Sequence, residues 1–191
     1  MIFLRELINL ILLVWRHPAN RGHRIVALGR LIRWQLRKRI RRKALIIEVF
    51  SVRRFKVVLD SKFSSLAYYN GGLPDWDEMN FLLRSLRSDD GFLDIGANVG
   101  YYTILASVRV APGSIWAAEA HPDNVSVLAE QLKMNGLDAV SVLPCALGAG
   151  NGQVRFSADA RETGSVTDQV GSTTFAVEMR TLDSWLPSSA I

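Results

Sequence analysis

The residues best suited to chemistry lie in two short groups along the chain. The first is the run 94–100 (DIGANVG), where an acid precedes a glycine-rich turn, and the second begins at Glu119, 25 residues after Asp94. Gly96 and Gly100 let the backbone approach a ligand closely, and the two carboxylates add fixed negative charge. The pattern predicts a binding site for a polar ligand. The alternative is a glycine turn that binds nothing.

The residue types in these groups favour one kind of ligand. A dinucleotide-binding turn has the pattern G-x-G-x-x-G, whereas this chain has Asn98 in place of the middle glycine and Asp94 ahead of the turn. A cofactor with an ammonium and a sulfonium group suits this charge better than a pyrophosphate does. Glu119 can accept two hydrogen bonds from a ribose diol, as acids do about 20 residues past the glycines of dinucleotide sites.

Short apolar runs that alternate with helical stretches predict the elements that position these residues. Strands are expected at 91–95, 114–118 and 140–143, and helices at 101–108 and 121–135. This alternation is typical of a doubly wound, Rossmann-like α/β sheet. Asp94 and Glu119 then stand at the carboxyl ends of consecutive strands, where such sheets bind their ligands.

Five segments, in the same order along the chain, resemble the motifs of the FkbM family of S-adenosylmethionine-dependent methyltransferases. They are 92–107 (FLDIGANVGYYTILAS), 118–124 (AEAHPDN), 132–137 (LKMNGL), 144–148 (PCALG) and 177–185 (VEMRTLDSW). The resemblance implies a class I methyltransferase fold, S-adenosylmethionine as cofactor, and O-methylation of a hydroxyl on a sugar or natural product. The family's F-E-P-x-P segment is A-E-A-H-P here, which retains the acid.

The resemblance also implies roles for individual residues. The implied cofactor-binding residues are Asp94, Gly96, Ala97, Asn98, Gly100, Glu119, Ala120, Asn124 and Ala146. Those of the glycine turn would hold the methionine end and Glu119 the ribose. Ala120 and Ala146 would flank the adenine, and Asn124 would support the turn. No catalytic base and no metal ligand is assigned.

The resemblance stops near the C-terminus. Family members continue into a strand that reads K-I-D-x-E-G, which this sequence lacks. The residues from 91 onward suffice for about three βαβ units, and some are taken by expected strands at 153–156 and 175–180. We therefore expect the first half of a methyltransferase sheet in a truncated chain, with one flank of the first strand uncovered. The alternative function is a non-catalytic remnant that acts as a membrane-associated or binding module.

The front of the chain is strongly basic. Residues 1–60 hold 15 Lys and Arg against 3 Asp and Glu, a net charge of +12, whereas the remainder carries −7. Eleven of these basic residues lie between Leu7 and Ile47 without a single acid. A solvated face is the usual meaning of such a run. An anionic membrane surface contacting residues 1–43 is the second interpretation, and nucleic acid, which we do not favour, is the third.

Residues 1–74 are predicted to form a separate basic region before a methyltransferase domain at 75–191. Helices are expected at 1–15 and 24–43, a β-hairpin within 46–60, and a loop at 61–76. The first helix would reach roughly 21 Å, against about 30 Å for a hydrocarbon core, so it is too short to span a bilayer. It either lies in a membrane interface or packs on protein.

Composition sets the remaining limits. With 49% apolar and 21% charged residues among 191, the chain belongs to the folded rather than the disordered class. Cys145 is the single cysteine, which excludes an intrachain disulfide and a cysteine-based zinc site. A cytoplasmic location is the expectation, with peripheral attachment to the inner face of the membrane as its extension.

Overall fold

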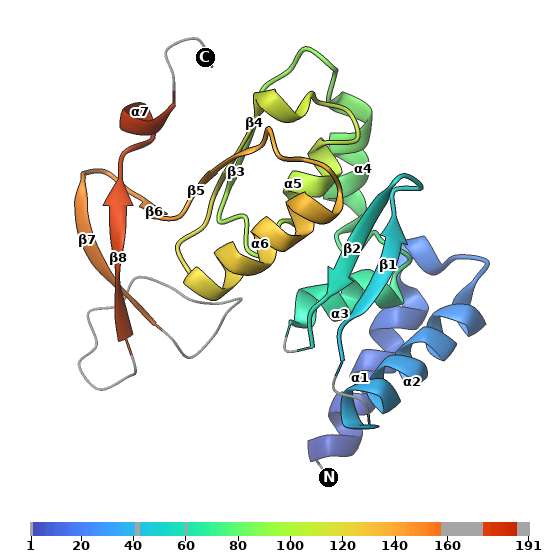
Figure 1. The fold of residues 1–191 in the computed structure, drawn as a ribbon. Helices are drawn as coiled ribbons and strands as arrows, with labels where there is room; N and C mark the ends of the chain where they lie inside the picture. Colours follow the sequence, from blue (N-terminus) through green and yellow to red (C-terminus); the bar gives the residue numbers. More distant parts are fainter. Residues whose placement is uncertain (1, 41–42, 60, 158–173, 187–191) are drawn as a thin grey trace. The chain divides into compact units, whose positions relative to one another are not determined.

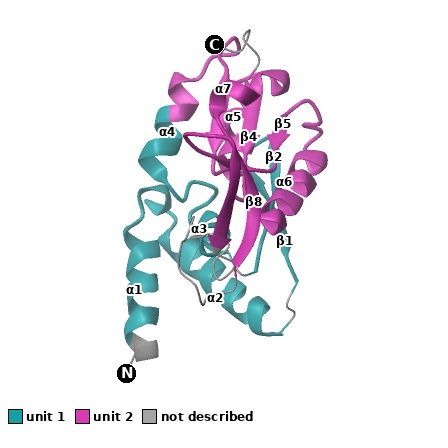
Figure 2. Cartoon of the chain, turned by 90° about the vertical axis from the view of Figure 1, so that its left-hand side faces the viewer, with its two compact units in different colours: residues 1–81 teal, residues 82–191 magenta. Residues whose placement is uncertain are grey.

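The computed structural model describes residues 2–40, 43–59, 61–157 and 174–186. The chain divides into two compact units, residues 1–81 and residues 82–191, which Figure 2 shows in different colours. The division falls inside α4 (Trp76–Ser85), later than the 74/75 boundary expected from the sequence.

Unit 1, residues 1–81, is built from helices and one hairpin (Figure 1). In chain order its elements are α1 (Ile2–Arg16), the 3-10 turn η1 (Pro18–Asn20), α2 (Arg24–Ile40), β1 (Leu45–Val49), β2 (Arg53–Val57) and α3 (Lys62–Tyr69). α1 packs on α2, α2 on α3, and α3 on β2. The buried side chains of Trp34, Phe55 and Tyr69 form its centre, and the Trp34 indole N–H donates a hydrogen bond to Ser65 Oγ at 3.0 Å.

Helix α3 corrects the sequence prediction, which treated residues 61–76 as a loop. The Ser61 side chain caps this helix, because its hydroxyl oxygen accepts a hydrogen bond from the Ser64 amide at 2.9 Å. Gly71 and Gly72, with φ of 63° and 91°, lie directly after the helix. The turn residues that suggested a loop therefore mark only the end of a short helix.

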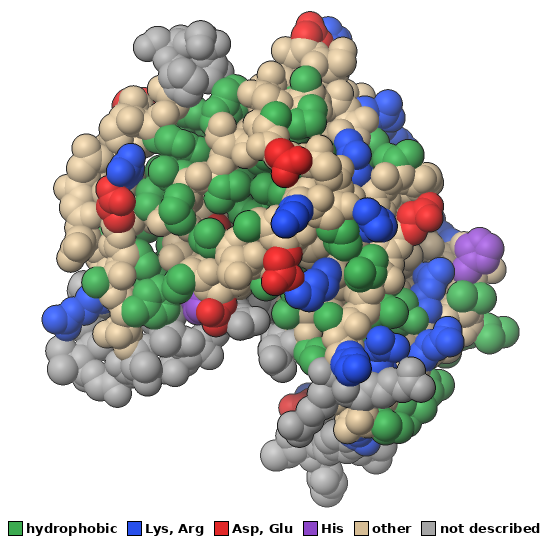
Figure 3. All heavy atoms as spheres, viewed as in Figure 1, with side chains coloured by type: hydrophobic (Ala, Val, Ile, Leu, Met, Phe, Trp, Pro, Cys, Tyr) green, Lys and Arg blue, Asp and Glu red, His purple; other side chains and the backbone are tan. Residues whose placement is uncertain are grey.

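Helix α2 confirms the predicted helix but has two apolar faces. Ala27, Leu31 and Trp34 face the core, whereas four of the five apolar residues whose spacing predicts this helix are exposed and the fifth, Leu28, is half-buried. These exposed residues are Ile25 (81%), Ile32, Leu36 and Ile40 (75%), which we call the outer stripe. Figure 3, which keeps the view of Figure 1, shows Lys and Arg side chains gathered over the part of the picture that holds α2, with hydrophobic side chains among them.

Unit 2, residues 82–191, is an α/β unit with a partial Rossmann-like arrangement. Its three-stranded sheet consists of β3 (Phe92–Ile95), β4 (Ile115–Ala118) and β5 (Ser141–Leu143), in that order and all parallel. α5 (Tyr101–Ala106) and the 3-10 turn η2 (Pro112–Ser114) connect the first two strands, and α6 (Pro122–Met134) connects the next two. This arrangement confirms the predicted fold class and strand order. Within the described residues, β3 pairs with β4 alone.

A second, mixed sheet follows in unit 2. β6 (Ala146–Leu147) runs parallel to β8 (Thr174–Arg180), which pairs on its other side with antiparallel β7 (Gly152–Ser157), and α7 (Leu182–Trp185) comes last. Cys145, between β5 and β6, is 2% exposed and lies in a cluster with Ala118 and Leu143. This burial raises the pKa of the Cys145 thiol, and the negative charge of Glu178 acts in the same direction.

Candidate functional site

The candidate site forms where the parallel strands of unit 2 end. Ile95 pairs with Ala118, and Ala118 pairs with Leu143, so the strands finish level with one another. The glycine turn after β3 and Glu119 after β4 therefore meet at one edge of the sheet, as predicted from the sequence. The amides of Gly96 and Ala97 both donate to the Ala118 carbonyl oxygen at 2.9 Å, which fixes the turn to the end of β4.

The Glu119 carboxylate joins three parts of this edge. Its Oε2 accepts a hydrogen bond from the Asn98 amide at 2.8 Å, and its Oε1 accepts one from the His121 amide at 2.7 Å. The Glu119 amide itself donates to the Leu143 carbonyl oxygen at 3.1 Å, and the residue is 7% exposed. Each carboxylate oxygen has a second lone pair, so Glu119 can accept further hydrogen bonds from a ligand.

Three residues of the turn adopt left-handed backbone conformations. Gly96, Asn98 and Gly100 have φ of 75°, 49° and 84°. Asparagine tolerates this conformation better than most residues, so Asn98 can take a position in this turn that a glycine often takes elsewhere. The Asn98 side-chain oxygen is buried and has no hydrogen-bond partner among the described residues. Such an atom is an acceptor available to a ligand.

Gly100 is required for a second reason, which is close packing. A Cβ atom at this position would lie 2.4 Å from Cδ1 of Leu128, a fully buried residue of α6. At Gly96, by contrast, an added Cβ would meet nothing within 4 Å. Gly100 thus serves the packing of the turn on α6, while the space above Gly96 is open to a ligand.

Asp94, in β3, is the second carboxylate of the site. The Thr103 hydroxyl donates a hydrogen bond to Asp94 Oδ2 at 2.5 Å. Burial raises the pKa of the Asp94 carboxyl group and the charge of Glu119 raises it further, whereas hydrogen bonds from Thr103 lower it, and the net shift is upward. Two neighbouring carboxylates of like charge make a site that favours a cationic group.

The raised pKa of Asp94 predicts a pH-dependent effect of the Asp94→Asn substitution. Because the folded chain holds the Asp94 proton more tightly than the unfolded chain, the contribution of this group to stability is largest in acid. It falls as the pH rises through the interval between the ordinary and the raised pKa. We expect Asp94→Asn to raise the free energy of unfolding at pH 7, with no gain at a pH below the ordinary aspartate pKa, as measured by urea denaturation.

The exposed Asp138 provides the matched control for this measurement. Asp138→Asn should change the free energy of unfolding by less than about 0.5 kcal/mol at either pH. A loss of stability at neutral pH in Asp94→Asn would contradict the burial argument, since it would mean that the charge of Asp94 stabilises the fold.

The structure brings the predicted residues of the turn and Glu119 to one place. The residues of the turn, Asp94, Gly96, Ala97, Asn98 and Gly100, share the sheet edge with Glu119. Ala120 follows Glu119 and is half-buried, and Asn124 is buried in the first turn of α6. Ala146 lies on β6, paired with Met179 in the second sheet. The cofactor contacts of all these residues stay predictions.

Two contacts of the site could not be read from the motifs. Thr103 hydrogen-bonds Asp94 from the first turn of α5, and the backbone of His121 binds Glu119. Thr103 lies three residues after Gly100, in the first turn of the predicted helix, and its hydroxyl could have been recognised there as a hydrogen-bond donor to the site. His121 caps α6, with its Nδ1 accepting a hydrogen bond from the Asp123 amide at 3.2 Å, and its ring meets that of Phe175 edge-on at 5.1 Å.

The described residues limit two other kinds of site. They contain no group of three or more His, Cys, Asp or Glu side chains that could hold a metal ion. None of the helices in the described ranges is both long enough and apolar enough to span a bilayer.

Comparisons with known proteins give similarities at the level of solved structures. No protein-family model matches the chain, and no curated protein matches its sequence. Methanocaldococcus jannaschii Trm5 in complex with adenosine is 18% identical over 55% of this chain and 29% of that chain, with a TM-score of 0.39. M. jannaschii TYW2 in complex with AdoMet is 20% identical over 53% of this chain and 42% of that chain, with a TM-score of 0.40.

A third similar structure is the methyltransferase FkbM from Methylobacillus flagellatus KT. It is 14% identical over 67% of this chain and 35% of that chain, with a TM-score of 0.38. The chain therefore spans less than half of the length of each of these three proteins. At these identities and TM-scores the similarities assign the chain neither to a family nor to an activity.

Proposed function

We propose that the chain is an S-adenosylmethionine-dependent methyltransferase that methylates a hydroxyl group of a sugar or natural product, in the manner of the FkbM family. The observation that carries the proposal is that Asp94 and Glu119 both lie beside one turn whose residues 96, 98 and 100 have left-handed backbone conformations. Glu119 also accepts a hydrogen bond from the Asn98 amide of this turn. The sequence motifs at 92–107 and 118–124 support the same assignment.

The residues of the site fit this cofactor in charge and in hydrogen bonding. The two carboxylates favour a ligand with an ammonium and a sulfonium group over a pyrophosphate. The buried oxygen of Asn98 offers an unused acceptor, and the space above Gly96 lets a ligand approach the backbone. A dinucleotide would place its negative phosphates beside Asp94, which the charge of that residue disfavours.

Each residue then has a defined task. Glu119 accepts hydrogen bonds from the ribose hydroxyls, and Asp94, oriented by Thr103, holds the amino-acid end together with residues 96–100. Ala120 and Ala146 border the adenine, and Asn124 supports the turn from α6. S-adenosylmethionine, when bound, would supply a methyl group to the hydroxyl oxygen of the acceptor: the bond from the methyl carbon to sulfur breaks as the bond to oxygen forms, and S-adenosylhomocysteine and a proton are released. The protein contributes mainly proximity and alignment to such a transfer.

The proposal extends to the acceptor and to the location of the protein. A small-molecule or glycan hydroxyl follows from the FkbM resemblance, and a cytoplasmic location follows from the single cysteine. A second candidate function is a non-catalytic module that binds through its basic helices. The outer stripe of α2, which combines exposed apolar side chains with basic neighbours, favours this second candidate.

Calorimetric titration of the purified chain tests the proposed cofactor. We expect S-adenosylmethionine and S-adenosylhomocysteine to bind, and NAD to bind at least tenfold more weakly, because Asp94 repels its phosphates. Transfer of a labelled methyl group to sugar and polyketide hydroxyls then tests the reaction. Binding of NAD with equal affinity, or no binding of either sulfur nucleoside, would refute the proposed function.

A further inference from the structure

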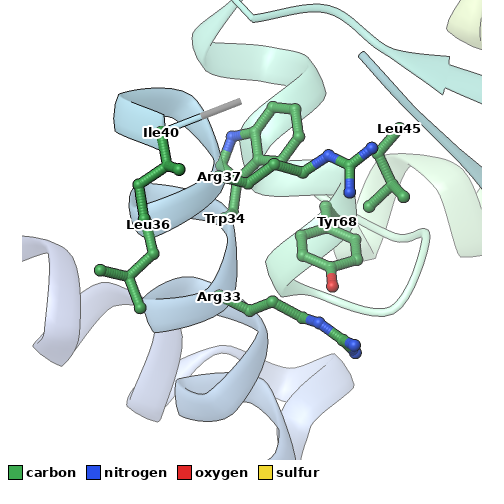
Figure 4. A pocket seen from close by; sticks show the side chains of 7 residues that line it. All are labelled: Arg33, Trp34, Leu36, Arg37, Ile40, Leu45 and Tyr68. Atoms are coloured by element: carbon green, nitrogen blue, oxygen red, sulfur yellow. The ribbon is translucent and has the colours of Figure 1, made fainter. Parts of the chain in front are cut away.

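A pocket of about 420 Å³ lies in unit 1 and is separate from the site described above (Figure 4). Residues of α2, β1 and α3 line it: Arg33, Trp34, Leu36, Arg37, Ile40, Leu45 and Tyr68. Among the described residues, the lining combines two guanidinium groups, two aromatic rings and three aliphatic side chains, and none of them is an acid. This composition is suited to a ligand that has both an anionic and an apolar part.

The two arginines occupy consecutive turns of α2 on the same side of the helix. The Arg37 Nε and Nη2 donate to the carbonyl oxygens of Lys43 and Ala44 at 3.2 and 3.3 Å. These contacts hold the guanidinium in place and leave three of its five N–H groups for a ligand. Arg33 is exposed, and no hydrogen bond or ion pair joins it to another of the described residues. The pocket thus has one fixed and one unengaged cation.

Tyr68 adds a third donor between these arginines. Its ring lies 5.9 Å from the Trp34 ring, centroid to centroid, in a tilted contact that fixes its orientation. In Figure 4 the Tyr68 ring lies between the Arg33 and Arg37 side chains, with its hydroxyl directed toward the side of Arg33. The Tyr68 hydroxyl and the Arg33 side chain therefore lie toward one end of the ring, and the Arg37 guanidinium lies toward the other. The first two can together donate to the several oxygens of a phosphate group.

The apolar part of the pocket continues onto the surface of the helix. Leu36 and Ile40 line the pocket and also belong to the outer stripe of α2. A second groove, of about 350 Å³, has Leu36 in its lining too, together with apolar residues such as Leu7, Leu10 and Ile32 and the charged residues Glu6 and Arg39. An apolar chain attached to a phosphate in the pocket therefore meets exposed aliphatic side chains of α2 at Leu36 and Ile40.

We propose that this pocket binds a phosphate-bearing amphiphile. Arg33 and the Tyr68 hydroxyl bind the phosphate, Arg37 adds positive charge to the pocket, and the apolar chain follows Leu36 and Ile40 along α2. A small soluble anion would make no contact with these aliphatic side chains, and a neutral lipid would leave the guanidinium groups without an anionic partner. The proposal is independent of the proposed methyl transfer, because all of the residues concerned belong to unit 1.

Titration calorimetry on the full chain with dihexanoyl phosphatidic acid, a water-soluble amphiphile, tests the pocket. We expect this compound to bind at least tenfold more tightly than inorganic phosphate. Arg33→Gln should lower the affinity about tenfold, since charge-assisted hydrogen bonds are the strong ones, and Tyr68→Phe should lower it a few-fold. The matched control is Arg16→Gln, an exposed arginine of α1 outside the lining, which should stay within twofold of the unmodified chain.

Flotation with vesicles distinguishes the sources of the ligand. If the chain recognises lipid in a bilayer, it floats with phosphatidic acid vesicles and not with phosphatidylcholine vesicles, and Arg33→Gln reduces recovery more than Arg16→Gln does. If it takes a monomeric amphiphile, only the soluble compound binds, with the same order of variants. Equal losses in Arg33→Gln and Arg16→Gln would indicate unspecific charge attraction and overturn the proposal. Equal binding of inorganic phosphate would overturn it as well.

Discussion

Replacing Gly100 with alanine is expected to lower the free energy of unfolding by about 3 kcal/mol, the larger part of it from a steric clash. The residue has φ of 84°, which an alanine adopts only with strain, and its new Cβ would lie 2.4 Å from Leu128 Cδ1. Leu128 is fully buried and cannot move away freely. Urea denaturation followed by circular dichroism measures this loss.

Two other glycines separate strain from clash in the same assay. Gly136 has φ of 64°, but a Cβ there meets nothing within 4 Å, so Gly136→Ala should cost only about 1 kcal/mol of strain. Gly29 lies within α2 with open space around it, so Gly29→Ala should add about 0.5–1 kcal/mol through helix propensity. The Leu128 contact would be unimportant if Gly100→Ala cost no more than Gly136→Ala.

Removal of the Glu119 carboxylate should damage both the fold and the proposed cofactor binding. In Glu119→Ala the buried amides of Asn98 and His121 lose their acceptors, and each unsatisfied amide costs about 1–3 kcal/mol. Binding of S-adenosylhomocysteine should weaken by a further ~1.5–3 kcal/mol, the scale of hydrogen bonds to a charged group. Denaturation measures the first effect, and titration of the chain that remains folded measures the second.

Glu119→Gln refines this experiment because the glutamine keeps the shape and one acceptor oxygen. We expect it to recover part of the stability while binding of the cofactor remains weakened. Asp138→Asn, at an exposed position outside the site, provides the control and should change both quantities by less than about 0.5 kcal/mol. Unchanged affinity in Glu119→Gln and Glu119→Ala would remove Glu119 from the ribose role, whatever their stability.

The sequence predicted the sheet edge of unit 2 well because two local signals agreed there. Apolar runs of strand length alternate with helical stretches, and Asp94 and Glu119 lie at the ends of two of these runs. In a parallel sheet this correspondence alone brings the two acids together. The Asn98 conformation was not predicted, because an asparagine is compatible with both left- and right-handed backbone, and the tertiary hydrogen bonds that hold this turn to Ala118 and Glu119 are not visible in the sequence.

The sequence was less informative about unit 1. In α2 the spacing of Ile25, Ile32 and Leu36 indicates a helix, but spacing cannot tell which of two apolar faces is buried. The core selects the face of Trp34, because its large ring fills the space beside α3 and its indole N–H reaches Ser65. For α3, the glycines and tyrosines near its end suggested a loop, and a helix of only two turns is too short to give a clear apolar spacing in the sequence.

Because Cys145 is buried, its reaction with an alkylating reagent reports local unfolding of the chain. The thiolate is the form that attacks alkylating reagents, and burial both shields it and disfavours its formation in the folded chain. Since this is the single cysteine, each chain that opens around β5 and β6 gains one label, and intact mass resolves labelled from unlabelled molecules. The rate of labelling thus gives the local opening free energy at the end of the sheet without an introduced probe.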